Sequence, residues 1–372
     1  MRSWLYLVLV GGCGFSVGNG TTDGSVTRDD ARDAPPLTDD APADASFCYG
    51  TGFGRTCLTS EPTGPRTINM AIFDTDGAGC TQVTNGLCIV SATDLDVPTG
   101  ASVRALGSRP LVLVASGTLT IVGTIGASSI STGPSGAGAS TAPCTALVAA
   151  GADQGGGAGG SGGSFGGTGG SGGTGDLNDN DLPAGSPAGQ AAASPVMPTS
   201  VRAGCGGGTG GAGVGAAGAG GSGGGAIYLI AGTSIVVTGR VFSVGHGGSA
   251  GTLLGGGGGG GSGGLIGLDA PMITSAGTIV ANGGGGGEGG GVASTGAPGS
   301  DGFSNGQPAF GGTGNPGGNG GDGSGIGSTN GSPGQSVNEG GGGGGGAAGV
   351  IYVKGNFVPG ASTISPPASV TP

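Results

Sequence analysis

Long glycine tracts limit the folds open to this chain more than any other feature. Glycine supplies 103 of the 372 residues, and the tracts separate short apolar stretches. Because glycine loses more conformational entropy on ordering than any other residue, a globular core of ordinary shape is not expected. The tracts lack a strict Gly-X-Y period, and the 22 prolines are too few for collagen. The tracts are therefore either disordered or part of a repetitive fold with many tight turns.

The apolar stretches repeat one pattern. A short strand, a small-residue turn, a second strand, a glycine and a third strand follow one another in copies that begin at Arg109, Gly225, Gly264 and Gly349. Three short strands per copy, with apolar residues at alternate positions, are typical of one turn of a parallel β-helix. We therefore expect an all-β fold, a parallel β-helix with long glycine-rich insertions. An antiparallel β-sandwich made from the same strands is the alternative.

Matching positions in the copies predict which residues stack. Leu95 lies 24 residues before Leu119, and Gly123, Gly239 and Gly277 hold the same place in three copies. Stacked copies share a narrow aliphatic interior, since one copy cannot bury its inner face alone. The expected core residues are Leu119, Ile121, Ile125, Ile235, Val237, Val241, Ile273 and Ile279.

The glycine tracts are expected to leave this body at one corner and return to it. They cover about 131–222, 245–263 and 282–347. Long insertions are tolerable there because the entropy cost of closing a loop grows slowly with its length. The tracts form either loose loops or extended polyglycine helices packed side by side. The packed form would resemble some glycine-rich phage adhesin tips and arthropod antifreeze proteins.

The first residues are typical of an exported lipoprotein. Arg2 precedes a short apolar stretch, Trp4 to Val10, which is too short to span a bilayer. The sequence from Val10 to Cys13 resembles the bacterial lipobox, which predicts a signal peptide at 1–12 and lipidation of Cys13. Gly14, rather than an aspartate, follows the cysteine and favours the outer membrane or cell surface.

An acidic tether and a folded domain are expected after the lipidated cysteine. Residues 13–46 are rich in Asp, Pro, Ala and Thr and have little apolar surface to bury, so we expect a disordered tether. Residues 47–372 are expected to form the β-helix domain with its glycine-rich loops. The tether would hold this domain away from the membrane to which the lipid attaches the protein.

Six further cysteines predict three disulfides, because an even number in an exported chain usually forms a disulfide framework. Fifteen pairings are possible for six cysteines. Neighbouring positions favour two short loops, and the remaining pair would close the base of the first long glycine tract. The expected pairs are Cys48 with Cys57, Cys80 with Cys88, and Cys144 with Cys205. A zinc site is disfavoured because no Cys-x-x-Cys motif occurs.

Candidate catalytic residues are few. Gly245-His246-Gly247 resembles the Gly-His-Gly of polygalacturonases, but the paired aspartates and the Arg-Ile-Lys element of those enzymes have no counterpart on neighbouring copies. We therefore expect His246, the single histidine, to be a solvated loop residue without a fixed partner. Asp94 and Asp96 alternate on one strand, but no third carboxylate joins them to form the calcium cluster of a pectate lyase.

One acidic segment is a weak candidate for calcium. Asp176, Asn178, Asn180 and Asp181 lie close together in sequence, and alternating Asp and Asn oxygens are suitable calcium ligands. The segment is not an EF-hand, because Asp181 stands where that loop needs glycine. Calcium is accordingly the one cofactor that the sequence allows for, and no other is expected.

The net negative charge and a resemblance to one protein family further define the expected partners and location. The formal net charge is −11 and lysine and arginine number only 10, so nucleic acid is not an expected partner. The lipobox and segments such as "CYGTGFGRTCLTSEPTGP" and "RPLVLVASGTLTIVGTIGAS" resemble a family of uncharacterised glycine-rich bacterial surface lipoproteins with a right-handed parallel β-helix. This resemblance implies an exported, surface-held β-helix and implies no activity.

We therefore expect a lipid-anchored cell-surface protein with a structural or adhesive role and no catalytic activity. Its expected partners are the membrane, through the lipid, and extracellular polysaccharides or surface proteins. The alternative is a polysaccharide-degrading β-helix enzyme, a lyase or glycoside hydrolase. A cluster of three or more carboxylates in a groove near Asp94 and Asp96 would favour the enzyme.

Overall fold

The computed structural model describes residues 47–372 except 132, 140–143, 145–146, 179–186 and 191–196. The expected signal peptide, the lipidated Cys13 and the tether lie outside the described residues. In the described part the fold is all-β and contains no helix. It consequently has no helix of the length and apolarity that crossing a bilayer requires.

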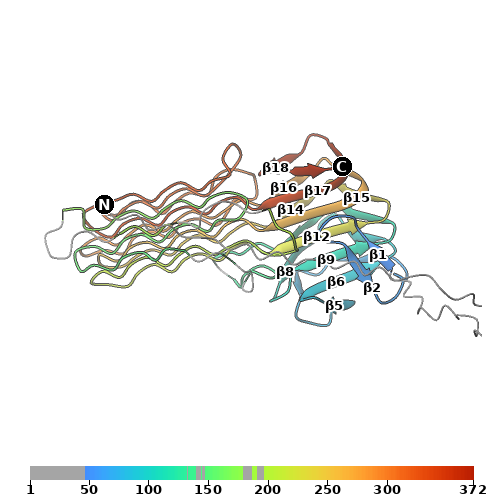
Figure 1. Ribbon diagram of the computed structural model, residues 1–372, viewed down its shortest axis with the longest axis horizontal. Helices are drawn as coiled ribbons and strands as arrows, with labels where there is room; N and C mark the ends of the chain where they lie inside the picture. Colours follow the sequence, from blue (N-terminus) through green and yellow to red (C-terminus); the bar gives the residue numbers. More distant parts are fainter. Residues whose placement is uncertain (1–46, 132, 140–143, 145–146, 179–186, 191–196) are drawn as a thin grey trace, which may run out of the picture. The chain divides into compact units, whose positions relative to one another are not determined.

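The strands form one short hairpin and two larger curled sheets at one end of the described part (Figure 1). The hairpin consists of β1 (Phe47–Tyr49) and β2 (Thr56–Leu58). The larger sheet contains β3 (Arg66–Thr67), β5 (Gln82–Thr84), β6 (Leu87–Ala92), β7 (Leu95–Val97), β9 (Leu111–Ala115), β10 (Thr118–Ile121), β12 (Ala226–Ala231), β13 (Ser234–Val237), β15 (Leu265–Ser275), β17 (Val350–Pro359) and β19 (Ser369–Thr371). The smaller sheet contains β4 (Ile72–Asp74), β8 (Ser102–Leu106), β11 (Thr124–Gly126), β14 (Arg240–Phe242), β16 (Thr278–Val280) and β18 (Thr363–Ser365). We call these two sheets together the strand body.

Strands far apart in the sequence pair in parallel and in register. Leu119 is paired with Leu95 on one side and with Ile235 on the other, and Ile235 is paired in turn with Ile273. Among the named strands, only the β1–β2 and β5–β6 pairs are antiparallel. The antiparallel sandwich is therefore wrong for the repeated strands, while the 24-residue offset between Leu95 and Leu119 is confirmed.

The interior of the strand body is aliphatic, as the alternating pattern predicts. All eight expected core residues have no exposed surface. They belong to one cluster with the inward-facing residues of β6, β9, β12, β15 and β17. Burying a side chain of this size contributes about 1.5–3 kcal/mol, so the stacked aliphatic rows are the main source of stability for this part.

The corner glycines are required by the stacking. A Cβ added at Gly239 would lie well inside 3.0 Å of the carbonyl oxygen of Gly123. A Cβ added at Gly277 would lie just as close to the carbonyl oxygen of Gly239. Since real Cβ atoms do not approach a backbone oxygen that closely, each copy needs glycine at this corner. The matching positions of the three glycines in the sequence are thus explained by one steric contact.

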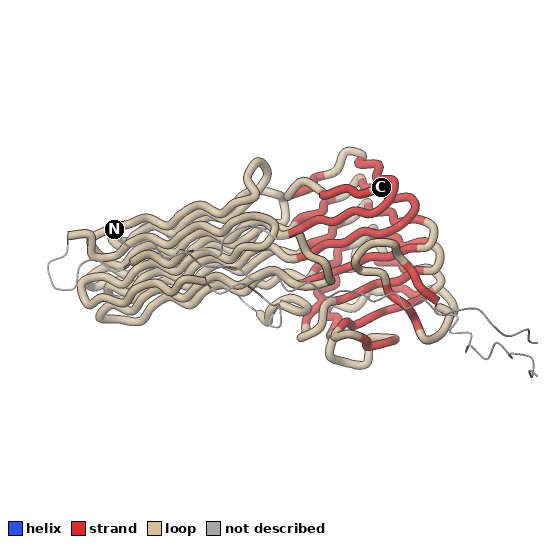
Figure 2. The backbone as a smooth tube through the Cα atoms, viewed as in Figure 1, coloured by secondary structure: helices blue, strands red, loops and turns tan. Residues whose placement is uncertain are grey.

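The glycine tracts are ordered and extend away from the strands as segments that lie side by side (Figure 2). Segment 157–163 donates backbone hydrogen bonds to 254–260, segment 257–263 donates to 341–347, and 341–347 donates back to 157–163. The N···O distances are 2.8–2.9 Å, and the bonds recur at every third residue. This period is that of a polyproline II helix, which has three residues per turn and no internal hydrogen bonds. We call residues 155–176, 203–225, 243–264 and 281–349 the glycine bundle.

Where its central segments touch backbone to backbone, the bundle has room only for glycine. A Cβ added at Gly257 would lie well inside 3.0 Å of the carbonyl oxygen of Gly287, and one at Gly260 would meet that of Gly284. The backbones can approach this closely because neither segment has side chains between them. The packed alternative for the tracts is therefore correct for the described residues, and the loose-loop alternative is wrong there.

Candidate functional site

The β1–β2 hairpin covers the outer face of the larger sheet. Its two strands are joined by the Cys48–Cys57 disulfide, whose cysteines are directly paired in the ladder. A second apolar cluster lies between the hairpin and the sheet. Its buried members are Leu58, Ile89, Val112, Val114, Phe165, Val201, Ala226, Tyr228, Ile230, Leu265 and Val350. The hairpin therefore turns an outward sheet face into a second, smaller core.

A buried carboxylate holds the turn of this hairpin. Asp269 of β15 is only 2% exposed. One of its oxygens accepts the backbone N–H groups of Thr51 at 2.9 Å and Gly52 at 2.7 Å, and the other accepts the Thr51 hydroxyl at 3.4 Å. Hydrogen bonds from backbone N–H groups to a carboxylate are charge-assisted and stronger than neutral ones. Asp269 thus fastens the hairpin turn to the sheet.

Gly50 makes the close approach to Asp269 possible. Its φ is +81°, in the left-handed region that glycine adopts without strain. A Cβ at this position would lie 2.8 Å from an Asp269 carboxylate oxygen, so any side chain would displace the turn. The hairpin turn and the buried acid consequently depend on each other.

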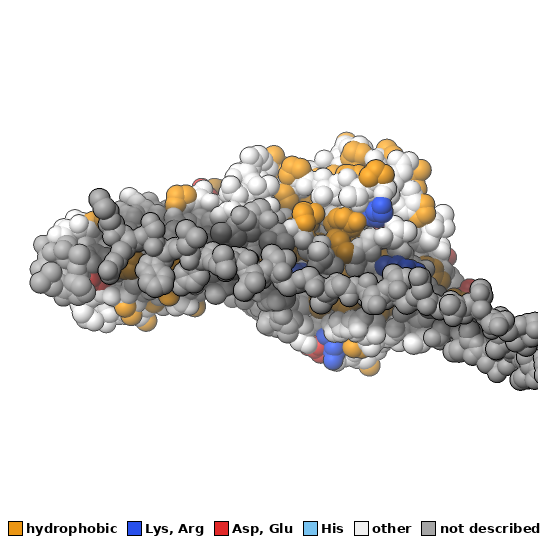
Figure 3. Space-filling model, viewed as in Figure 1, with side chains coloured by type: hydrophobic (Ala, Val, Ile, Leu, Met, Phe, Trp, Pro, Cys, Tyr) orange, Lys and Arg blue, Asp and Glu red, His pale blue; other side chains and the backbone are white. Residues whose placement is uncertain are grey.

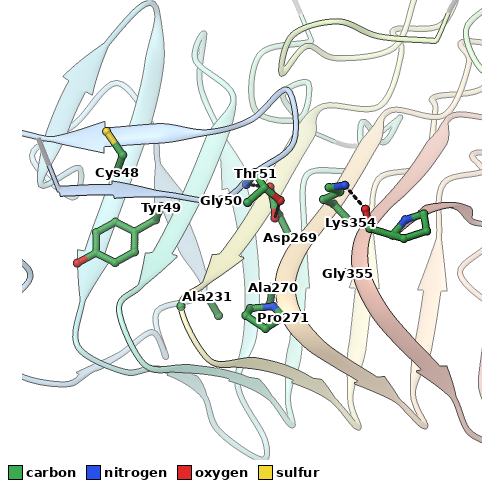
Figure 4. Close-up of a pocket in the computed structure, with 12 residues that line it drawn as sticks. Cys48, Tyr49, Gly50, Thr51, Ala231, Asp269, Ala270, Pro271, Lys354 and Gly355 are labelled. Carbon is green, nitrogen blue, oxygen red and sulfur yellow. Dashed lines mark hydrogen bonds between the residues drawn. The ribbon is translucent and has the colours of Figure 1, made fainter.

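A cavity of about 470 Å³ opens beside Asp269 (Figure 4). Tyr49, Ala231 and Pro271 are among the residues that line it. Lys354 of β17 also lines the cavity and donates a hydrogen bond to the carbonyl oxygen of Pro372. The volume is that of a small-molecule site. Its two charged groups are both already engaged, Asp269 by backbone N–H groups and Lys354 by a carbonyl oxygen.

Aromatic rings fill the other side of the hairpin. The Phe53 ring centroid lies 5.4 Å from that of Tyr228 and 4.6 Å from that of Tyr352. Tyr228 has no exposed surface, and its hydroxyl lies near the Gly54 backbone and the Asp269 carboxylate without making a hydrogen bond of good geometry to any described residue. Burial, together with the nearby charge of Asp269, raises the pKa of Tyr228 well above its ordinary value. The hydroxyl therefore stays protonated at neutral pH.

The expected disulfides are present with the pairing that the sequence analysis favoured. Cys80 is bonded to Cys88, next to β6, and Cys144 is bonded to Cys205 at a separation of 61 residues. The third bond ties the start of the first glycine tract to the bundle. Because none of these six cysteines is free, none is a candidate nucleophile or metal ligand.

His246 has a fixed partner, contrary to the expectation of a solvated loop residue. Its Nε2 lies 3.9 Å from a carboxylate oxygen of Asp301, and both side chains are about three-quarters buried. Asp301 also accepts the backbone N–H groups of Gly247 at 3.1 Å and Ser131 at 2.9 Å. The carboxylate joins three segments that are remote in the sequence, and no sequence pattern marks that connection.

The carboxylates considered for sugar chemistry are not part of any metal-holding group of three or more acidic, His or Cys side chains among the described residues. One oxygen of Asp94 accepts the backbone N–H of Thr118 at 2.8 Å, while Asp96 is paired through its backbone with Thr120 of β10. A separate cavity of about 470 Å³ follows the corner between the two sheets, where Thr124, Arg240 and Thr278 lie in register on successive strands. Its lining contains no carboxylate.

The calcium candidates are only partly described. Asp176 is 2% exposed, with φ of +45°, and Asn178 is exposed in the same turn. Asn180 and Asp181 lie outside the described residues. Within the ranges that the structure describes, no group of three or more His, Cys, Asp or Glu residues is arranged to hold a metal.

Sequence reasoning missed the buried carboxylate that holds the hairpin turn. Asp269 stands in "GLIGLDAPMI", a stretch otherwise made of glycine and apolar residues. A lone carboxylate in a buried strand is rare unless it is paired, so this context could have identified it as a structural anchor. Its partners, Thr51 and Gly52, lie 218 and 217 residues away and have no local signature.

Comparison with known proteins does not assign a family. No family model, no curated protein and no solved structure matches the chain. A functional conclusion must therefore come from the arrangement of the residues themselves.

Proposed function

We propose that this protein is a non-catalytic, lipid-anchored protein of the outer membrane or cell surface, which displays the glycine bundle for a structural or adhesive role. In this proposal the signal peptide is removed, Cys13 is lipidated, and residues 13–46 are the tether. The proposal includes membership of the glycine-rich surface lipoproteins that the sequence resembles.

The strand body is proposed to be a parallel β-helix that carries the bundle. Parallel pairing of β7, β10, β13 and β15 in one sheet, and of β8, β11, β14 and β16 in the other, supports this proposal. Each turn would supply one position at the corner from which a glycine segment leaves. A high-resolution experimental structure of the mature protein tests the coil, and an open sheet sandwich would contradict it.

The ordered glycine bundle is the observation that carries the proposal. Segments such as 255–264 run ten residues from a turn to the next strand, which corresponds to about 30 Å at a rise of about 3.1 Å per residue. A bundle of this length built from hydrogen-bonded backbones is stiff and exposes few reactive side chains. Such an element is suited to presenting a surface at a distance from the strand body.

The use of the buried acids supports a structural rather than a catalytic role. Glu288 has no exposed surface and accepts the backbone N–H groups of Ala297 at 2.7 Å and Asn315 at 2.6 Å. Asp269 and Asp301 are engaged in the same way. Carboxylates that satisfy backbone donors stabilise chain crossings and are poorly placed to exchange protons with a substrate.

The disulfides support an exported location. Disulfides persist in oxidising compartments and are rare in the cytosol. Of the two short ones, Cys48–Cys57 closes the β1–β2 hairpin and Cys80–Cys88 closes a loop in the N-terminal part of the strand body, while the long one fastens the first glycine tract.

Palmitate labelling combined with surface proteolysis tests the proposal. Wild-type protein expressed in a Gram-negative host should incorporate palmitate, sediment with membranes and be cleaved by protease added to intact cells. Cys13→Ala should abolish the label and release the protein from the membrane fraction. Unchanged membrane association of Cys13→Ala would overturn the anchor, and depolymerisation of a polysaccharide by the purified protein would overturn the non-catalytic role.

A further inference from the structure

The glycine bundle ends in a set of turns that lie at one common distance from the strands. The chain returns to a strand ten residues after Ala216, Gly255 and Gly340, and it leaves β16 eleven residues before Gly291. Equal segment lengths bring these turns together at the end opposite the strands (Figure 2). We call this end, formed by residues 175–178, 213–216, 252–255, 291–295 and 337–340, the distal end.

Backbone hydrogen bonds show that the distal turns touch. Gly215 donates to the carbonyl oxygen of Leu253 at 2.7 Å, and Leu253 donates to that of Ser294 at 3.2 Å. On the other side, Leu177 donates to the carbonyl oxygen of Val337 at 3.2 Å. Gly340 donates to the carbonyl oxygen of Gly290, next to the turn 291–295, at 3.1 Å and so joins the two groups, and the five turns therefore form one continuous surface.

This surface carries exposed aliphatic side chains. Leu177, Val214, Leu253 and Val292 are 55%, 65%, 42% and 69% exposed. Each comes from a different turn, and each stands next to tracts made almost entirely of glycine. Aliphatic side chains exposed together gain no stability from burial in the free protein, so a further reason for them is needed.

Backbone strain at one of these turns indicates that its side chains have a function. Leu253 and Leu254 have φ of +41° and +67°, in the left-handed region that glycine adopts freely and leucine adopts only at a cost. Glycine follows at Gly255 and fills most neighbouring positions, so the chain has leucine where glycine would be less strained. Strain of this kind is typically kept where a side chain has a function.

The charges of the distal end define the chemistry of a partner. Asp176 and Glu339 lie in its turns, the first buried and the second half-buried, and the carbonyl oxygen of the buried Glu288 accepts the backbone N–H of Gly251 just behind them. The glycine bundle contains no Lys or Arg among its described residues, and Arg202, which directly precedes the segment 203–225, packs over the Phe165 ring. In the view of Figure 3, the visible blue Lys and Arg side chains lie over the strand body and its border with the bundle. The distal end thus exposes aliphatic side chains, and the charged side chains of its described turns are all carboxylates.

We infer that the distal end is a docking surface for a protein partner that presents an apolar patch rimmed by Lys or Arg. The described distal turns contain no Lys or Arg, which disfavours nucleic acid and anionic lipid headgroups as partners, because both attract cations. The described distal turns also contain no aromatic side chain on which a sugar ring could stack. This inference rests on the proposed adhesive role, for which it specifies the contact surface and the kind of partner.

A peptide-display experiment on the purified full chain tests the inference. A phage library of random twelve-residue peptides is selected on the immobilised protein, and enriched peptides are synthesised for affinity measurement. Enriched sequences should combine apolar residues with Lys or Arg, and their affinity should fall at least tenfold for Leu253→Gly and for Val292→Ser. Val83→Ser, which changes a valine 52% exposed on the strand body, is the matched control and should bind like the wild type.

The Leu253→Gly variant separates binding from folding. Replacing leucine at φ of +41° with glycine relieves strain, so this variant should unfold at the same urea concentration as the wild type or a higher one while binding more weakly. The inference is overturned if no peptide is enriched, or if enriched peptides bind both distal variants as tightly as the wild type. Variant-sensitive binding to phosphatidylglycerol vesicles, or self-association abolished by Leu253→Gly, would assign the surface to lipid or to a second copy instead.

The outcome is independent of the lipid anchor. Peptide binding is measured with purified protein, whereas palmitate labelling of Cys13 is measured in cells. A negative result in the peptide-binding experiment therefore does not affect the test of the lipid anchor, and a negative labelling result does not affect the test of the docking surface.

Discussion

Two adjacent glycines of the bundle, Gly206 and Gly207, test whether close backbone packing is the reason why the tracts contain so few residues other than glycine. A Cβ added at Gly207 would lie 2.6 Å from the carbonyl carbon of Gly259 and 2.7 Å from the carbonyl oxygen of Gly260. A Cβ added at Gly206 would have one neighbour, the carbonyl oxygen of Gly221, at 3.3 Å. Neither glycine has a positive φ, so alanine can adopt both backbone conformations.

The expected cost of Gly207→Ala follows from these contacts. The Gly259 carbonyl must move to at least 3.0 Å from the new Cβ, and its oxygen accepts a hydrogen bond from Gly221 at 2.9 Å. Overpacking costs about 1–3 kcal/mol, and a weakened buried hydrogen bond costs about 1–3 kcal/mol. Alanine also lowers the conformational entropy of the unfolded chain, which offsets about 0.4–1 kcal/mol of this cost. Gly207→Ala should therefore lower the free energy of unfolding by about 2–5 kcal/mol.

Gly206→Ala is the matched control, and it should change the free energy of unfolding by less than about 1 kcal/mol. Urea unfolding followed by far-UV circular dichroism measures both variants. Equal effects at the two positions would refute the reasoning, because loose loops tolerate alanine equally at neighbouring sites.

Three further predictions concern the hairpin and the disulfide that fastens the first tract. Tyr228→Phe should leave stability at pH 7 unchanged or slightly higher, since it removes a buried hydroxyl that makes no hydrogen bond of good geometry to a described residue. Because the folded pKa of Tyr228 lies above the ordinary 10.0, its contribution is complete below that pH and is lost as pH rises further. Urea unfolding from pH 8 to 11 should show a smaller loss for Tyr228→Phe, and equal losses would contradict the burial argument. Asp269→Leu should cost about 1–3 kcal/mol and expose residues 47–58 to limited proteolysis, whereas a protected hairpin would show that Asp269 does not hold it. The double variant Cys144→Ser with Cys205→Ser opens a loop with a separation of 61 residues and should cost about 4 kcal/mol. An unchanged midpoint in non-reducing thermal unfolding would contradict that last value.

The repeated strands were predictable because their signals are local. Alternation of apolar residues places Leu119, Ile235 and Ile273 on the inner face, and all three are fully buried. Matching corner glycines fixed the alignment of the copies, and register pairing follows from that alignment. The six cysteines had many possible pairings, but closeness in sequence marked the two short loops.

Other contacts have no signature along the chain. Asp269 meets Thr51 across 218 residues, and Asp301 meets Ser131 across 170. The expectation that His246 lacks a partner was wrong for the same reason, since Asp301 lies in a different glycine tract. A sequence pattern shows which side chains exist, but it does not show which remote turns the fold brings together.

The sequence by itself determined that short aliphatic strands alternate with tracts too poor in side chains for an ordinary core. It also determined the corner glycines and the residues that fill the interior. Only the tertiary structure decided that the tracts are ordered and that their turns meet at one end. The physical reason is that the bundle is held by backbone hydrogen bonds between neighbouring segments, and every glycine offers the same donor and acceptor whichever segment lies beside it.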